Sequence, residues 1–185
     1  MKENRGLALR SEATDGFTLT ELLVTTSIIL LFSAIIFPNF NLGEKNLALE
    51  RSSVKLAQDL GRAREMAMSG KEFAGAPPTF KGAYGVKLER NASDYILFAD
   101  LDDDQIFDPN EAVETILLEK NIRISAVINY HEGGGGGIEP VIVTVTFLPP
   151  DPKINMIDDA IIVTLNNGSR TKNIKVNKAG LINVE

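Results

Sequence analysis

Cysteine and tryptophan are absent from this sequence of 185 residues, and His131 is its one histidine. Without cysteine, the chain can form neither a disulfide framework nor a thiolate metal site. One histidine cannot build a histidine-rich metal centre, and no convincing nucleophilic triad can be assembled from the remaining residues. We therefore predict that the protein is not an enzyme, that it requires no cofactor, and that its domain is held together by packing alone.

Positive charge is also scarce, because 19 lysines and arginines stand against 25 acidic residues and give a net charge of −6. A protein whose whole surface follows nucleic acid needs clustered cations, so this class is excluded. Hydrophobic residues make up 44% of the chain, which is enough to bury one ordinary core. These values predict one globular domain with an acidic exterior, together with smaller appendages.

The N-terminus combines a polar segment with an apolar one. Residues 1–16 contain Lys2, Arg5 and Arg10, and they lack the apolar run that precedes the cleavage site of an ordinary secretory signal. Residues 17–38 are mostly apolar, and a helix of about 20 residues is long enough to cross a bilayer. Basic residues precede this span, which indicates a cytoplasmic N-terminus. We predict a leader followed by a single span of the cytoplasmic (inner) membrane, with the remainder outside.

One charged residue, Glu21, lies near the start of the predicted span, where an unpaired carboxylate is costly. The sequence GFTLTELLV arranges Gly16, Phe17 and Glu21 as in the processing site of type IV prepilins and type II secretion pseudopilins, and the chain resembles this family. The resemblance implies that prepilin peptidase cuts after Gly16 and that the new N-terminal Phe17 is methylated. The alternative is a simple signal anchor that tolerates a glutamate.

Cutting after Gly16 would create an α-amino cation that Glu21 of a neighbouring subunit could neutralise inside an apolar filament core. Such pairing would help to set the register between subunits. The resemblance further implies several partners: other pilin or pseudopilin subunits through the N-terminal helix, the prepilin peptidase, the inner-membrane assembly platform and, before assembly, membrane lipid.

Downstream of the span, the sequence predicts an α+β fold. Residues 39–70 carry apolar positions at spacings of three, four or seven, which predicts an amphipathic continuation of the helix. Residues 71–185 are predicted to form an antiparallel β-sheet domain against which this long helix packs. Asn167 and Gly168 predict a hairpin with a type I′ turn. The predicted strands are 84–88, 95–99, 122–128, 141–148, 160–165 and 174–184.

This order of elements, with the runs RAREMAM, YILFADLDDD and VTVTFLPP, resembles the FimT/GspH type of minor pilin and pseudopilin. The resemblance implies a structural subunit, a minor pilin or pseudopilin of a type IV pilus or type II secretion filament. The alternative function is a DNA-binding or adhesive pilin of an uptake system. The sequence leaves open whether the filament serves secretion, motility or DNA uptake.

An acidic segment follows the second predicted strand and contains six carboxylates in twelve residues without a cation. Its spacing is that of an EF-hand calcium loop, except that Gln105 stands where that loop has glycine. A weak calcium site, with a dissociation constant of about 10⁻⁴ to 10⁻³ M, and a solvated acidic turn remain alternatives. The candidate ligands are Asp100, Asp102, Asp104, the carbonyl of Ile106, Asp108 and Glu111.

The strands near the C-terminus carry a local positive bias. Arg170, Lys172, Lys175 and Lys178 give the last strands a basic bias, which predicts either a DNA contact or a solvated sheet edge that discourages aggregation. The acidic composition of the whole chain favours the edge. The glycine run 133–137 is not followed by Lys-Ser or Lys-Thr, so it is interpreted as a strand connection rather than a phosphate cradle.

Overall fold

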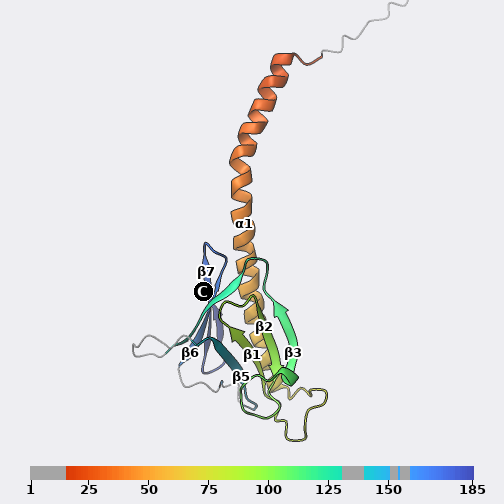
Figure 1. The fold of residues 1–185 in the computed structure, drawn as a ribbon, viewed down its shortest axis with the longest axis vertical. Coiled ribbons are helices and arrows are strands. Elements are labelled where there is room, and N and C mark those ends of the chain that lie inside the picture. Colours follow the sequence, from red (N-terminus) through yellow and green to blue (C-terminus); the bar gives the residue numbers. More distant parts are fainter. Residues whose placement is uncertain (1–15, 131–139, 151–153, 155–158) are drawn as a thin grey trace, which may run out of the picture. The chain divides into compact units, whose positions relative to one another are not determined.

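The computed structural model describes residues 16–130, 140–150, 154 and 159–185, and for residues 37–42 it describes the backbone alone. Within these ranges the chain has an α+β fold with one α-helix and eight strands, and the strands form two antiparallel sheets (Figure 1). The predicted class of fold is confirmed in this general form.

The chain divides into two compact units, Met1–Asn41 and Leu42–Glu185. Their boundary falls within helix α1, Leu19–Met68, which runs without interruption across the border between the two predicted segments 17–38 and 39–70. In the first unit, Leu19–Ile36 is long and apolar enough to span a membrane, and it is the one such segment among the described residues.

Local hydrogen bonds explain two features of α1. They show how its apolar N-terminal part accommodates polar side chains, and why the helix ends before Gly70. The hydroxyls of Thr26 and Ser27 donate to the carbonyls of Leu22 and Leu23, at 2.9 and 2.8 Å, so these polar groups are satisfied within the helix. At the other end, Gly70 has a φ of 60°, which favours glycine. The amides of Gly70 and Lys71 donate to the carbonyls of Ala67 and Met66, both at 3.1 Å, which is the Schellman pattern.

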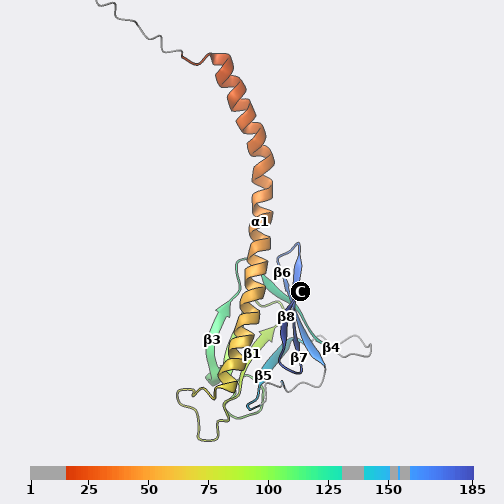
Figure 2. The same cartoon turned by 180° about the vertical axis from the view of Figure 1, so that it is seen from behind.

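The first sheet has the strand order β3-β2-β1-β5 and the second has the order β4-β6-β7-β8 (Figures 1 and 2). The strands of the first sheet are β1 (Tyr84–Glu89), β2 (Asp94–Ala99), β3 (Ala112–Leu117) and β5 (Ile142–Phe147). Those of the second sheet are β4 (Arg123–Tyr130), β6 (Ala160–Asn166), β7 (Thr171–Asn177) and β8 (Ile182–Val184).

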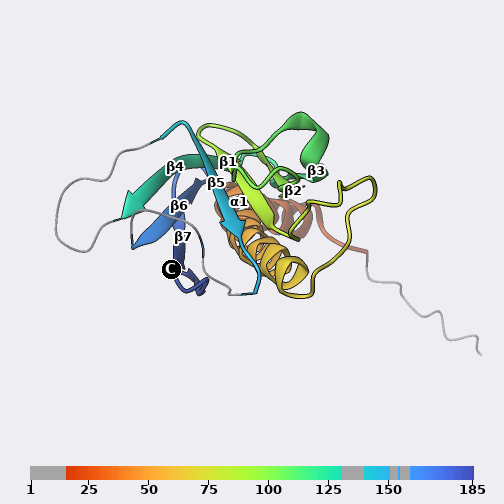
Figure 3. The same cartoon turned by 90° about the horizontal axis from the view of Figure 1, so that it is seen from below.

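The core of the second unit lies between the C-terminal part of α1 and both sheets, which Figure 3 shows along the helix. One face of the helix is buried, at positions three, four or seven residues apart, as expected for an amphipathic helix. The buried helical side chains include Leu49, Leu56, Leu60, Ala63 and Ala67. Alternate side chains of the strands, such as Tyr84, Val86 and Leu88 of β1, complete this core.

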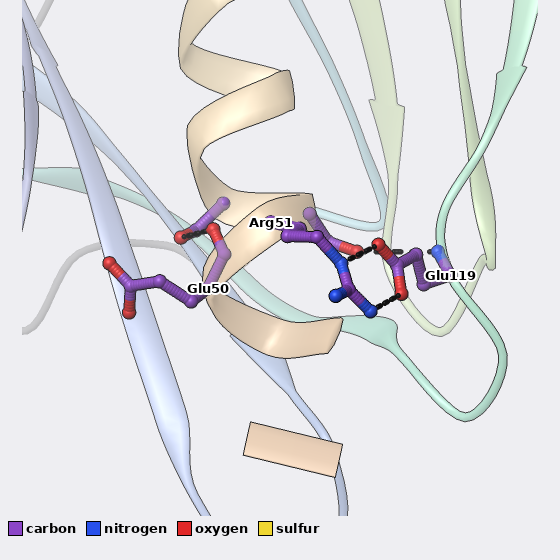
Figure 4. A network of polar contacts seen from close by, with 5 residues as sticks. Glu50, Arg51 and Glu119 are labelled. Atoms are coloured by element: carbon purple, nitrogen blue, oxygen red, sulfur yellow. Dashed lines mark hydrogen bonds and ion pairs between the residues drawn. The ribbon is translucent and has the colours of Figure 1, made fainter. Parts of the chain in front are cut away.

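Polar contacts reinforce the packing of the helix on the domain. The Tyr95 hydroxyl donates to Asp59 of α1 at 2.6 Å. Arg51 and Glu119 form two hydrogen bonds, at 2.7 and 2.8 Å, between the helix and the connection after β3 (Figure 4). Glu50, the neighbour of Arg51, points to the other side of the helix and forms an ion pair of 3.2 Å with Lys172 of β7.

Two strand predictions were wrong. The predicted strand 174–184 is two strands, β7 and β8, because the chain turns at Gly180, where φ is 73°. Strand β3 was not predicted, since Ile116 is its only fully buried side chain and an edge strand of this kind lacks apolar alternation.

The hairpin between β6 and β7 was predicted correctly, but its turn type was wrong. Asn166 pairs with Thr171, so four residues form the loop. Of the two residues expected at positive φ, only Gly168 has it, at 89°. The buried Asn167 side chain forms hydrogen bonds with both the loop and the helix. It accepts from the Arg170 amide at 2.7 Å and donates to the Lys45 carbonyl of α1 at 3.0 Å. A type I′ hairpin turn has a loop of two residues with positive φ at both, and this loop has neither feature.

Candidate functional site

The predicted processing site lies immediately before helix α1. Gly16, Phe17 and Thr18 are exposed and non-helical, and Phe17 is 88% exposed. A β-carbon added to Gly16 would meet no heavy atom within 4 Å, so the described structure does not itself require glycine at this position.

Glu21 is held at the beginning of α1 by Thr18. The Thr18 amide and hydroxyl both donate to one Glu21 carboxylate oxygen, at 2.9 and 2.8 Å, and the Glu21 amide donates to the Thr18 hydroxyl at 3.3 Å. This reciprocal arrangement is a capping box, in which the residue before the helix and the third helical residue satisfy each other's amides. It accounts for a carboxylate at the start of an apolar helix, because the charge lies where the free helix amides are.

Glu21 is the only ionisable residue of the apolar segment Leu19–Ile36. Within the described chain, the Glu21 carboxylate has a local partner, Thr18. Thr18 directly follows Phe17, whose amide nitrogen would become the new N-terminus after cleavage. The arrangement brings Gly16, Phe17 and Glu21 together at one end of one helix. Chemically, it offers a carboxylate beside the position where cleavage would create a cation.

The acidic segment folds into a compact loop between β2 and β3. Carboxylate oxygens of Asp100, Asp102 and Asp104 all lie within 4.8 Å of one another, which is the spacing that a shared cation needs. Both carboxylate oxygens of the candidate ligand Glu111, which is buried, accept amides of the loop, those of Leu101 and Asp108, at 2.7 and 2.9 Å. Calcium coordination by these groups stays a prediction.

Gln105 takes the conformation that an EF-hand assigns to glycine. Its φ is 64°, and that of Asp103 is 66°, both in the left-handed region. The Gln105 carbonyl accepts the Thr144 hydroxyl of β5 at 2.7 Å, which fixes the loop to the first sheet. The departure from the calcium-loop pattern at Gln105 therefore changes the residue but preserves the backbone turn.

The acidic loop also covers the outer face of the first sheet. Phe107 packs edge-on against Phe98 of β2, with 5.7 Å between ring centroids. Phe98 is fully buried, because Gly85 of β1 leaves room for its ring; a β-carbon on Gly85 would come within 2.7 Å of it. The geometry of the loop is thus coupled to the packing of the sheet.

The pKa of Asp100 is raised to about 6, chiefly by burial and to a lesser extent by the nearby carboxylates of Glu111 and Asp103. The amides of Gln105 and Asp103, which donate to Asp100 at 3.0 and 2.8 Å, oppose this rise because they favour the charged form. A cation bound by Asp100 would also favour the charged form, so proton and cation would compete for this carboxylate.

The four predicted C-terminal cations do not form one strip. Side chains alternate along a strand, so Lys172 lies on the face of β7 that carries the buried Ile174, and Lys175 lies on the opposite face. Lys172 pairs with Glu50, and the Lys175 ammonium lies 5.0 Å from the centre of the Tyr130 ring. Arg170 precedes β7 and Lys178 follows it.

The prediction that these cations protect a sheet edge was wrong for Lys175, because β8 pairs with residues 174–176 of β7. This strand lies between β6 and β8, and the edge of its sheet is β8. The four cations therefore lie on different faces and at different ends of β7, and a DNA contact stays a prediction.

In comparisons with known proteins, no family model, curated protein or solved structure matches this chain. The resemblance to pilins consequently stays an expectation that depends on the residues quoted for it. The function has to be inferred from the residues and geometry of the chain itself.

Two features of the candidate sites escaped the sequence analysis. The capping box had a readable signal, Thr18 followed three residues later by Glu21. The attachment of the acidic loop through Thr144 and Phe107 had none, because Thr144 is 39 residues from its partner Gln105. A contact at that separation depends on strand order, which no local motif specifies.

Proposed function

We propose that the chain is the membrane-inserted precursor of a type IV pilin-like subunit, a minor pilin or pseudopilin, that is cut after Gly16 and assembles through the apolar half of α1. One observation carries this proposal. An exposed Gly16–Phe17 segment leads directly into a capped helix whose apolar window, Leu19–Ile36, has no buried residue and one charged residue, Glu21.

The exposed apolar surface of α1 supports a role in assembly. Large apolar side chains in this window are half-exposed or more, and water is an unfavourable environment for so much contiguous apolar surface. Membrane lipid would cover this surface before assembly, and the helices of other subunits would cover it afterwards. The outward-facing part of the subunit would be the folded unit Leu42–Glu185.

Glu21 supports the same proposal through its cost in an apolar environment. In the precursor, the capping box with Thr18 supplies its partner. After cleavage, the amino group of Phe17 becomes a second partner, either in the same chain or in a neighbour, and an ion pair inside an apolar core needs such a counter-charge. The inner-membrane assembly platform would then receive the processed subunit.

The test uses the full chain expressed with an active prepilin peptidase, followed by mass spectrometry of the N-terminal peptide. We expect the wild-type chain to begin at N-methylated Phe17, and Gly16→Val to retain Met1. Gly43→Val is the matched control, because a β-carbon at Gly43 also meets nothing within 4 Å and this glycine lies outside the processing site. A wild-type chain that keeps Met1, or is cut elsewhere, would contradict the proposal and leave an anchored β-domain.

The DNA-binding alternative receives no comparable support. Its four cations are divided between the two faces and the two ends of β7, and one of them already pairs with Glu50. If it were nevertheless correct, replacing Arg170 and Lys172 by alanine would reduce DNA retention by the assembled subunit. Unchanged retention would dismiss the alternative.

A further inference from the structure

An open pocket of about 600 Å³ lies among three connections of the folded unit. The turn between β1 and β2 contributes Asn91 and Ser93, the connection between β3 and β4 contributes Lys120 and Asn121, and the β6–β7 hairpin closes the other side. Ligand pockets in proteins usually have volumes of about 300 to 1,000 Å³, so this space is of a suitable size for a small oligomer.

The walls of this pocket are fixed by hydrogen bonds between the connections. The Asn91 amide donates to the Ile124 carbonyl at 2.7 Å, and the Ile124 amide donates to the Ala92 carbonyl at 3.0 Å. The Leu118 amide donates to the Ser93 carbonyl at 2.9 Å. Together with the bonds from Asn167 to the hairpin and to α1, these contacts hold three distant segments in place. A preformed site loses less conformational entropy when it binds a ligand.

Polar side chains of the pocket are unused by the fold. Asn91, Ser93 and Asn121 are exposed and make no side-chain hydrogen bond within the described part of the chain. Each amide presents two donors and one acceptor, an arrangement suited to the hydroxyl groups of a ligand. An apolar ligand that covered these groups without pairing them would bind less favourably than one that forms hydrogen bonds with them.

The charge of the pocket is positive. Lys120 and Arg123 are exposed and have no carboxylate partner among the residues that the structure describes. The one acidic side chain in the lining, Glu119, is already held by Arg51 through both of its oxygens. Two uncompensated cations beside open amides favour a ligand that carries both hydroxyl groups and a negative charge.

We propose that this pocket binds an acidic saccharide. The amides of Asn91 and Asn121 would pair with sugar hydroxyls, and Lys120 and Arg123 would pair with the carboxylate of a uronic acid. Leu117, which is 72% exposed at the rim, offers an aliphatic surface to the C–H face of a sugar ring. This binding role is separate from filament assembly, since the pocket belongs wholly to the folded unit and uses no residue of the apolar segment.

The test is isothermal titration calorimetry of the full chain in detergent micelles. The probes are tetragalacturonate, an uncharged galactose tetrasaccharide and inorganic phosphate. We expect tetragalacturonate to bind about tenfold more tightly than the neutral sugar, and its affinity to fall as salt increases. Phosphate alone should bind no more tightly than the neutral sugar, because it lacks the hydroxyl groups that the amides would pair with.

Two variants and one control locate the binding. Asn121→Asp keeps the shape of the side chain and tolerates the positive φ of 69°, but it adds a negative charge; Lys120→Ala removes a positive one. Both should weaken tetragalacturonate binding about fivefold or more, while Lys71→Ala, an exposed cation outside the pocket, should leave it unchanged. Equal binding of the acidic and neutral sugars, equal binding of phosphate, no binding at all, or unchanged affinity in both pocket variants would each overturn the proposal.

Discussion

The two halves of helix α1 have the same secondary structure and opposite relations to the rest of the chain. The C-terminal half buries one face against two sheets, with Leu56 and Leu60 fully buried. The N-terminal half, Leu19–Ile36, buries none of its residues, although it is the more apolar of the two. Hydrophobic burial therefore stabilises one half within the chain, and the other half leaves its apolar surface exposed there.

This difference separates two uses of apolar residues. In the C-terminal half they alternate with charged residues such as Arg51 and Asp59, whose partners on the domain fix the orientation of the helix. In the N-terminal half the apolar residues surround the helix, and Glu21 marks its beginning. An amphipathic pattern indicates packing on one side, whereas an apolar pattern on all sides indicates a lipid or multi-subunit environment.

The largest predicted effect comes from shortening a side chain in the buried half. Leu60→Ala should lower the free energy of unfolding of Leu42–Glu185 by about 2 to 5 kcal/mol, because it removes buried contacts and leaves a cavity. Hydrogen exchange of the full chain in micelles measures this for each segment. The matched variant Leu30→Ala, at a position 70% exposed, should leave exchange in the folded unit unchanged. If both variants accelerated hydrogen exchange in the folded unit equally, the claim that only the C-terminal half of α1 stabilises this unit would be wrong.

An intermediate effect should follow calcium addition, and it should be confined to the folded unit. If the acidic loop binds the ion, calcium at about ten times its dissociation constant should raise the free energy of unfolding by about 1.4 kcal/mol at pH 7.5. Slower hydrogen exchange within residues 100–111 would report it, while Leu19–Ile36 should be unaffected. No protection of the loop at about 10 mM calcium, tenfold above a millimolar dissociation constant, would favour the solvated turn.

The pH dependence of the same loop gives a second measurement. Because the pKa of Asp100 in the folded chain is about 6, above its usual value of about 3.9, the folded state binds this proton more readily than the unfolded state. Its stabilising contribution is complete below about pH 3.9 and is lost as the pH rises through 6. This pH-dependent loss of unfolding free energy should disappear in Asp100→Asn. It should persist in Glu72→Gln, which alters an exposed carboxylate outside the loop.

Much of the fold could be predicted because its signals are local. The end of α1 at Gly70 follows from glycine at a left-handed position, and strands such as β1 and β6 follow from apolar residues in short runs. The missing strand β3 and the division between β7 and β8 show where this approach fails. An edge strand with one buried side chain, and a turn inside an otherwise β-like run, depend on the neighbours that the strands acquire in the sheet.

The candidate sites follow the same rule. Gly16, Phe17 and Glu21 were grouped in one predicted site because they lie within six residues of the chain. Lys172 and Lys175 were grouped by the same reasoning, but strand alternation places them on opposite faces of β7. The acidic-saccharide pocket could not be predicted at all, since its three walls are far apart in the sequence and meet only through the hydrogen bonds between them.

The smallest predicted effect concerns the cap of the unburied half. Thr18→Ala should destabilise the first turn of α1 by about 1 kcal/mol, because Glu21 loses the hydroxyl that donates to it and the first turn loses an acceptor for its amide. Hydrogen exchange of the amides following Thr18 should therefore accelerate about fivefold in micelles, with no change in Leu42–Glu185. Thr18→Ser, which keeps the hydroxyl, should restore the protection. Acceleration in the serine variant as well would show that the methyl group, rather than the capping box, protects the beginning of the helix.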